Sequence, residues 1–447
     1  MRSFCTFILS LGLILNVVIS SGKADKRDLG REVLAANDGW AATSTGTTGG
    51  STASANQVYT VHNRKELVAA LNNGVYPPPS SNPSNVPKII YVDGTIDANV
   101  DDNNQPLSCA AYARNGYTLE AYLAAFDPAV WGRVPPTGPL ETARAASAAA
   151  QQARVRIRIG SNTTIVGVGK NTLIRGAWFD IRGTAGVVGS RTNIIVRNIT
   201  FQDSFDCFPQ WDPTDGSQGN WNSAYDSISL RDSDHVWIDH NTFLDKDTAD
   251  ETLPRYFGRL FQVHDGEVDI TNASDLVTVS YNRFLDHDKV MLIGSSDSAT
   301  ADRNKLRVTL HHNLFEGVGQ RGPRVRFGKV HVYNNYYTPK HSETYQYSLG
   351  VGRESAIFAE NNFFRTDADI TPDRFLSRLS GTAIHIVGSL VNAASDNHEV
   401  DVLAEYNGVN NPDLSGDVGW TPTLFLEIEP TFKVPSAIES RSGPFNW

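Results

Sequence analysis

Val236-Trp237-Ile238-Asp239-His240-Asn241-Thr242-Phe243 is one copy of an eight-residue pattern that recurs along the chain. The first and third positions are apolar, the sixth is Asn and the eighth is aromatic. Further copies begin at Val277, Val308, Val330 and Ile357, so that successive Asn residues are separated by 41, 31, 22 and 27 positions. A repeat with a shortest period near 22 and longer variants is typical of a solenoid with loops inserted into some coils.

The alternating apolar residues predict short strands that turn one side chain in two toward the interior. An Asn at the same place in each coil can occupy a bend and hydrogen-bond to the Asn of the next coil. We therefore predict an all-β parallel β-helix with peripheral loops and a few short helices, its strands stacked at about 4.8 Å. The alternative is an antiparallel β-sandwich, which would need two-residue hairpin turns that do not join these repeats.

The start of the 447-residue chain is typical of a secretory signal. Arg2 is followed by the apolar run from 4 to 19 and by small residues at 20–22, so we expect a secreted protein. An N-terminal membrane anchor is the alternative, but the run is short for a span. Cys109 and Cys207 could pair in an oxidising compartment or remain single.

The expected organisation follows from where the repeat begins and ends. It comprises a signal peptide at 1–22, an irregular lead-in at 23–55, the parallel β-helix at 56–375 and a C-terminal packing arm at 376–447. Residues 99–155 form a partly helical insertion, with helices expected at 119–126 and 140–153.

A basic segment stands out because the formal charge of the whole chain is -10. Arg321, Arg324 and Arg326 fall within six residues, and Arg303 to Lys329 contains seven Lys or Arg against one acid. Pro323 restricts the backbone around them, which favours arginines aimed at a planar anion such as a carboxylate over a solvated loop.

Three acids precede this basic segment: Asp226, Asp265 and Asp269. Four residues along a straight strand span about 13 Å, but Gly266 permits a bend that could bring Asp265 and Asp269 together. Asp226 would lie on the neighbouring coil. Three such carboxylates, with water completing the shell, suit Ca²⁺, although any one of them could be an ordinary surface acid.

Lys289 lies between the acids and the arginines, just past the bend that follows Asn282. It could bind an anion or form a salt bridge with Asp288. The histidines at 240, 264, 287, 311 and 312 lack a metal-ligand spacing, so we expect structural roles for them. The tryptophans at 178, 211, 221 and 237 could stack on sugars but are expected in the core.

Several motifs in order resemble the pectate lyases of polysaccharide lyase family 1. They are Val236-Trp237-Ile238-Asp239-His240, His287-Asp288-Lys289, and Arg321-x-Pro323-Arg324-x-Arg326-x-Gly328-x-x-His331 followed by Asn334-Asn335. The stretch from Asp206 to Asp226 is most similar to the bacterial calcium-dependent enzymes. The resemblance covers most of the chain after the signal and implies a right-handed parallel β-helix, secretion and calcium-dependent β-elimination of polygalacturonate.

The resemblance also implies roles for individual residues. Asp226, Asp265 and Asp269 match the calcium ligands, and Arg321 matches the Brønsted base. Lys289 and Arg326 match substrate-binding cations, and we expect Arg324, which lies beside them, to bind substrate as well. By pKa alone Lys289 would be the easier base, because free arginine has a pKa of about 12.5 or more. We expect a monomer that binds polygalacturonate and has no nucleic acid or membrane partner.

Two enzymatic alternatives share the expected fold. A pectin lyase would act on methyl-esterified polymer without calcium, and a polygalacturonase would hydrolyse the chain with paired acids. A third alternative is a non-catalytic pectin-binding solenoid, because solenoids offer long binding faces.

Overall fold

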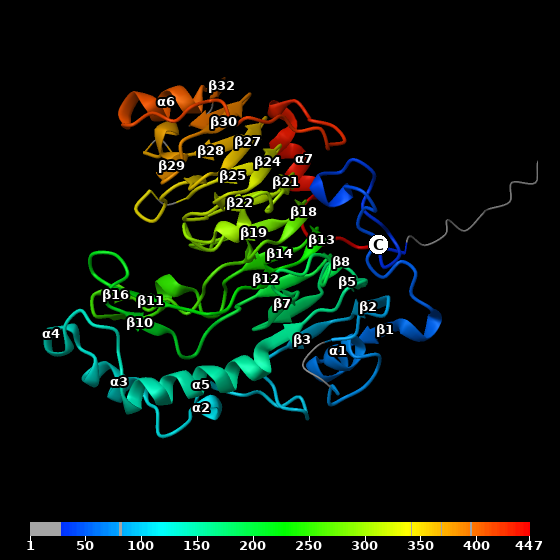
Figure 1. Ribbon diagram of the computed structural model, residues 1–447, viewed down its shortest axis with the longest axis vertical. Coiled ribbons are helices and arrows are strands. Elements are labelled where there is room, and N and C mark those ends of the chain that lie inside the picture. The colour runs from blue at the N-terminus through cyan, green and yellow to red at the C-terminus, as the bar shows by residue number, and fades with distance from the viewer. Residues whose placement is uncertain (1–27, 80–82, 341, 368, 394–395) are drawn as a thin grey trace, which may run out of the picture.

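The computed structural model describes residues 28–79, 83–340, 342–367, 369–393 and 396–447. The expected signal peptide lies outside these residues. Three long sheets run along the molecule and wind into one solenoid, with helical and loop segments projecting from it (Figure 1). All strand pairs within the three sheets are parallel except β31 with β32 at the C-terminal edge. The predicted parallel β-helix is confirmed.

Sheets A and B each contain ten strands. Sheet A comprises β1 (Val58–Val61), β2 (Lys88–Val92), β5 (Thr163–Gly167), β8 (Thr192–Arg197), β13 (Asp234–Asp239), β18 (Asp275–Ser280), β21 (Val308–His311), β24 (Lys329–Tyr333), β27 (Ala356–Glu360) and β30 (Ile384–Val387). Sheet B comprises β3 (Thr95–Asp97), β6 (Leu173–Arg175), β9 (Thr200–Gln202), β14 (Thr242–Leu244), β19 (Arg283–Leu285), β22 (Leu314–Glu316), β25 (Tyr336–Thr338), β28 (Phe363–Thr366), β31 (Leu390–Ala393) and β32 (Asp396–Glu399).

Sheet C contains eight strands and carries the candidate site. In spatial order it comprises β4 (Arg156–Arg158), β7 (Trp178–Arg182), β12 (Ile228–Arg231), β17 (Val268–Thr271), β20 (Leu292–Ile293), β23 (Arg324–Val325), β26 (Leu349–Gly352) and β29 (Leu376–Leu379). Each coil passes from sheet C to sheet A and then to sheet B, so consecutive coils place equivalent residues side by side.

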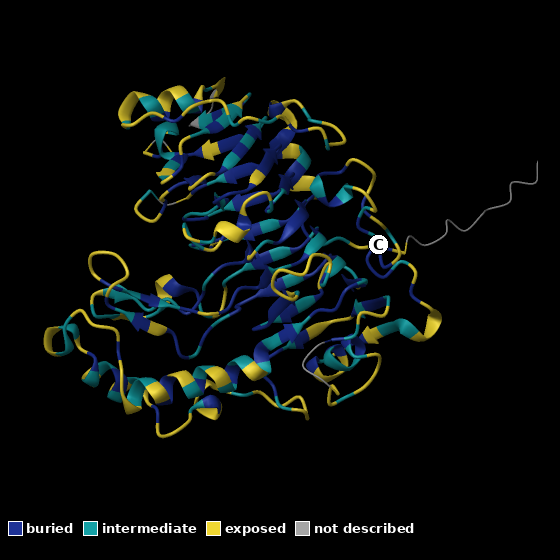
Figure 2. Ribbon diagram, viewed as in Figure 1, coloured by how far each residue is buried: buried dark blue, intermediate teal, exposed yellow. Residues whose placement is uncertain are grey.

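The repeat seen in the sequence becomes the register of the solenoid. Val236 lies opposite Val277, which lies opposite Val308, and the series continues through Val330 to Ile357. The aromatic position forms a column inside the coils, where the ring centroids from Phe243 through Phe284, Phe315 and Tyr337 to Phe364 are 4.8 to 5.0 Å apart. Figure 2 shows that the strands are mostly buried, whereas the projecting segments are more exposed.

The Asn position forms the predicted ladder. Asn241 donates its Nδ2 to Asn282 Oδ1 at 3.1 Å, and the same contact continues through Asn313 and Asn335 to Asn362. All five side chains are fully buried. The residue before each of them has a positive φ of 50 to 55°, which makes the bend between sheets A and B. Buried amides that are satisfied in this way stabilise the stacking of coils.

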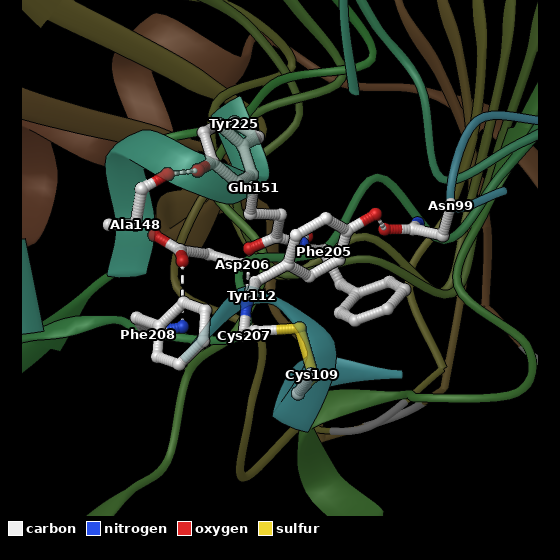
Figure 3. The surroundings of a disulfide bond; sticks show 10 residues. All are labelled: Asn99, Cys109, Tyr112, Ala148, Gln151, Phe205, Asp206, Cys207, Phe208 and Tyr225. Atoms are coloured by element: carbon white, nitrogen blue, oxygen red, sulfur yellow. Dashed lines mark hydrogen bonds between the residues drawn. A yellow bond between two sulfur atoms is a disulfide. The ribbon is translucent and has the colours of Figure 1, made fainter. Parts of the chain in front are cut away.

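The insertion after β3 is helical, as predicted, and begins with a short turn that is disulfide-linked. It contains α2 (Cys109–Tyr112), α3 (Leu119–Ala125), α4 (Pro128–Trp131) and α5 (Pro139–Val155), and α5 leads directly into β4. Cys109 and Cys207 form a disulfide bond, which resolves the question left open by the sequence (Figure 3). Tyr225 donates its hydroxyl hydrogen to the carbonyl of Ala148 and so holds α5 against sheet C.

The solenoid continues beyond Phe375, where the sequence had suggested its end. β29, β30 and β31 extend all three sheets. The last coil lacks both signals of the frame, because Ser389 occupies the Asn position and Val391 the aromatic position. α6 (Val402–Val409) lies at this end, and α7 (Val434–Arg441) packs Val434 and Ile438 on Leu314, Tyr336 and Phe363 of sheet B.

Shorter elements complete the chain. They are α1 (Arg64–Leu71), the antiparallel pairs β10 (Gln210–Asp212) with β11 (Asn220–Asn222) and β15 (Arg255–Tyr256) with β16 (Arg259–Leu260), and the 3-10 turns Trp40–Ala42, Ala55–Gln57, Asp250–Thr252, Thr300–Asp302, Pro372–Arg374 and Thr431–Lys433. Among the described helices, none combines the length and apolar character needed to cross a bilayer. The four tryptophans considered for sugar stacking are buried, as the core interpretation predicted.

Candidate active site

The three acids predicted to bind a cation come from two adjacent strands of sheet C. Asp226 lies two residues before β12, Asp265 lies three residues before β17, and Asp269 is the second residue of β17. The strands pair in parallel, with Ser229 opposite Asp269. Asp226 and Asp269 are buried, whereas the side chain of Asp265 is 33% exposed. The carboxylates therefore share one edge of the solenoid, and Asp265 opens it to solvent.

Gly266 makes this close approach possible. Its amide donates to Asp226 Oδ1 at 3.0 Å, and the amide of Leu292 donates to Asp269 Oδ1 at 2.9 Å. A Cβ on Gly266 would lie 2.6 Å from Asp269 Oδ1 and 3.0 Å from Asp226 Oδ1. Only glycine leaves room for both carboxylates. The residue at which the sequence predicted a bend therefore also lies in contact with two of the three acids. Ser229 donates its hydroxyl hydrogen to Asp226 Oδ2.

The carboxylates repel one another in this buried setting. Burial and the charge of Asp265 raise the pKa of Asp226 to about 6. Burial, with the charges of Asp226 and Asp265, raises the pKa of Asp269 well above its ordinary value. An added cation would relieve both effects, because oxygen ligands with negative charge are those that Ca²⁺ prefers. The donor set thus fits a hard divalent cation.

Lys289 completes one side of the acid site. Its Nζ lies 3.4 Å from Asp265 Oδ1. The sequence had offered Asp288 as a salt-bridge partner, but Asp288 instead accepts hydrogen bonds from the side chains of Gln262 and Gln320. Lys289 is buried and forms a parallel bridge with Gln320, the residue before Arg321. Lys289 and Arg321, the predicted base, therefore lie on neighbouring coils.

Arg321 faces the same acids. Its charge is among the influences that lower the pKa of Asp269, against the larger effects of burial and of the other carboxylates. The backbone of Arg321 has a φ of 61°, and its Nε is buried without a hydrogen-bond partner in the structure. A non-glycine residue in this region is strained, and an unpaired buried donor is uncommon. Both features favour a functional role.

The two remaining arginines differ in their surroundings. Arg324 is half-buried on β23, opposite Leu292 and Gly350, and burial followed by the charge of Arg326 lowers its pKa. Arg326 donates its Nε to Asp297 Oδ1 at 2.7 Å and its Nη1 to the carbonyl of Gly294 at 2.8 Å. Substrate binding by Arg326 would therefore require the guanidinium to exchange or share these partners.

A second acidic cluster, which the sequence did not reveal, lies directly beside the first. Ligand atoms within 4.8 Å of one another occur in two overlapping sets among the described residues, Asp203 with Asp245 and His264, and Asp245 with Glu267 and His287. The first acid site does not meet this spacing and is more open. The sequence contained a signal for this cluster. Asp245 lies two residues after Phe243, and Asp203 lies two residues after Phe201, which pairs with Phe243 on the preceding coil.

His287 joins the two clusters. Its Nδ1 lies 2.7 Å from Asp245 Oδ2 and its Nε2 lies 2.9 Å from the carbonyl oxygen of Asp265. Both ring nitrogens face acceptors, so both carry hydrogen. Burial opposes this charge, but Asp245 and Glu267 hold the pKa of His287 well above its ordinary value. The structural role expected for this histidine is therefore to fix the backbone of Asp265.

Known proteins give an independent view of the chain. A family model described as pectate lyase matches residues 137–405. The chain is 46% identical to a pectate lyase of Bacillus subtilis strain 168 over 437 residues, covering 97% of this chain and 98% of that protein. It is 34% identical to pectate lyase E of Dickeya dadantii over 391 residues, covering 85% and 82% of the two proteins.

Solved structures agree with these relatives. A thermostable pectate lyase superposes with a TM-score of 0.89 at 47% identity, covering 94% of this chain and all of that one. A pectate lyase bound to a hexasaccharide superposes with a TM-score of 0.85 at 45% identity, covering 93% and 99% of the two chains.

Proposed function

The chain belongs to the pectate lyase family, and we propose that it cleaves polygalacturonate by calcium-dependent β-elimination at the site formed by Asp226, Asp265 and Asp269. The observation that supports this site is the meeting of three carboxylates on adjacent strands, where the pKa values of Asp226 and Asp269 are raised and Lys289 and Arg321 lie beside them. The products would be 4,5-unsaturated oligogalacturonates.

The residues named above fit a calcium ion. Asp226, Asp265 and Asp269 would hold it, and their mutual repulsion gives the site a strong preference for added positive charge. When bound, the ion would neutralise a substrate carboxylate and stabilise the negative charge that develops beside it.

The side chains of the protein account for the proton transfer. Removal of the C5 proton is difficult because that carbon is next to a carboxylate, which disfavours a second negative charge. Lys289, Arg324 and Arg326 would bind the substrate carboxylates, and Arg321 would accept the C5 proton. The C–H electron pair then forms the C4–C5 double bond as the C4–O bond breaks, and the departing oxygen takes a proton from water. Free arginine is protonated at neutral pH, so the rate should rise toward alkaline pH.

The disulfide supports secretion of the enzyme. A bond between Cys109 and Cys207 forms and persists in oxidising compartments, whereas the cytosol keeps most thiols reduced. Together with the signal-like first 22 residues, this favours an extracellular enzyme that acts as a monomer on cell-wall pectate.

One assay separates the candidate functions. The purified protein is incubated with polygalacturonate at alkaline pH, with calcium or with a chelator, and the products are followed by the ultraviolet absorbance of the new double bond. We expect unsaturated products only with calcium. Products without absorbance would indicate a hydrolase, activity restricted to methyl-esterified pectin without calcium would indicate a pectin lyase, and binding without product would indicate a non-catalytic solenoid.

A further inference from the structure

The outer face of sheet C carries a second group of cations, on the rungs that precede the acid site. They are Arg156 and Arg158 on β4, Arg182 on β7 and Arg231 on β12, here called the arginine row. Residues that alternate with them, such as Ile157, Ile181 and Leu230, belong to the interior core. The side chains of Arg158 and Arg182 are 30% and 40% exposed.

The strand register places the arginine row in line with the candidate active site. Arg158 lies opposite Asp180, which lies opposite Ser229, which lies opposite Asp269. In the neighbouring line, Arg182 lies opposite Arg231. Adjacent rungs are about 4.8 Å apart, so the acid site on β17 lies about 14 Å from β4. A polymer that crosses the strands at the acid site would therefore pass over the arginines.

The charge of this region is unbalanced. Within β4, β7 and β12, which all lie in the described part of the chain, the one carboxylate is Asp180. Its oxygens lie 3.9 Å from Arg158 Nε and 3.3 Å from Arg182 Nε. Burial, followed by the charge of Arg158, lowers the pKa of Arg156. Within these three strands, one carboxylate is therefore set against four guanidinium groups.

An aromatic side chain orients part of the arginine row. The guanidinium carbons of Arg156 and Arg231 both lie 5.7 Å from the ring centroid of Trp178. Trp178 is itself fixed, because its Nε1 donates to Ser229 Oγ at 2.7 Å. Arginines held over an aromatic ring lose less conformational freedom when they bind a ligand.

We propose that the arginine row binds carboxylates of the same polygalacturonate chain that occupies the acid site, several sugar residues from the bond that is cleaved. This inference rests on the proposed function and extends it. Guanidinium groups pair with carboxylates through two parallel hydrogen bonds, and a polyuronate offers such a group on every sugar. The enzyme would then favour long, de-esterified substrates over short ones.

The test compares long and short substrates in a double variant. Arg156→Gln with Arg182→Gln removes two charges and leaves Arg158 beside Asp180. We expect kcat/KM on polygalacturonate to fall about tenfold, while kcat/KM on trigalacturonate and the calcium affinity stay unchanged. Lys170→Gln with Arg365→Gln removes the same charge outside sheet C and should have little effect on either substrate.

If the glutamine variant unfolds, Arg156→Lys with Arg182→Lys is used in its place, because it keeps both charges. This lysine variant should retain part of the preference for long chains. Equal losses on both substrates, or no loss on the long one, would overturn the proposal that the arginine row binds the polymer. Absence of unsaturated product from the wild-type enzyme would instead refute the proposed function.

Discussion

Two buried carboxylates on neighbouring coils behave in opposite ways. Burial and the charge of Asp265 raise the pKa of Asp226 to about 6. The side chain of Asp245 is only 7% exposed, but the charges of His287 and His264 overcome this burial and hold its pKa below the ordinary value. In the cluster around Asp245 the two histidines offset that carboxylate, although burial still raises the pKa of Glu267 to about 7. In the acid site two of the three carboxylates keep a raised pKa, even with Lys289 and Arg321 nearby. We therefore expect an ion from solution to bind at the acid site around Asp226.

The largest effect is expected from Arg321, which faces the acid site and not the histidine cluster. Arg321→Lys should lower kcat at least about 100-fold, because lysine cannot place a base at the same atom, while substrate binding is largely kept. Steady-state kinetics on polygalacturonate measures both quantities. Arg303→Lys, at an exposed pair with Glu354, is the matched control. A variant with more than about a tenth of wild-type activity would exclude Arg321 as the base.

Replacing one acid in each cluster should distinguish the acids that bind calcium from those that stabilise the fold. Asp269→Asn should weaken calcium binding about 100-fold, because it removes a charged ligand. Asp245→Asn should instead lower the melting temperature, because it leaves two buried histidines without their shared counterion. Calorimetric titration with calcium and thermal unfolding of both variants make the comparison. Loss of calcium binding in Asp245→Asn with retention in Asp269→Asn would reverse the assignment.

The link between the clusters can be cut at His287. His287→Gln removes the charged donor to the carbonyl of Asp265, so calcium affinity should fall about tenfold even if the fold is kept. His264→Gln disturbs the same cluster, but the partners found for its ring are Asp250, Asp245 and Thr248. It should destabilise the protein with little change in calcium affinity. Equal calcium affinities in the two variants would show that His287 does not position Asp265.

A smaller effect concerns pH. The pKa of Asp226 is about 6 in the folded protein and about 3.9 when unfolded, so the calcium-free fold binds more protons. Its stability should therefore fall as pH rises from about 4 to about 6. Calcium requires the ionised form, so the gain in melting temperature on adding calcium should grow over the same interval. Thermal unfolding at several pH values with calcium and with chelator measures it, and a constant gain would contradict it.

The fold could be predicted from the sequence because the same residues recur in the same frame. The Asn ladder from Asn241 to Asn362 and the column from Phe243 to Phe364 both follow from that frame. The last coil was missed because Ser389 and Val391 replace the signal residues. Coils can stack without the Asn ladder when their strands still pair. A search for the periodic residues alone does not detect such a coil.

The position of a site residue could be predicted only where a residue nearby in the sequence, or the repeat itself, determines it. Gly266 predicted the bend that brings two acids together, and the repeat placed Asp226 one coil away. The pairing of Lys289 with Asp265 instead of Asp288 depends on side chains from different coils, as does the contact of Arg326 with Asp297. The roles of these residues in binding and catalysis remain predictions.

Diffraction from crystals grown with calcium would test the central assignment most directly. We predict one strong peak of electron density at about 2.3 to 2.6 Å from carboxylate oxygens of Asp226, Asp265 and Asp269. A peak between Asp245 and Glu267 or beside His264, with none among the three acids, would contradict the account.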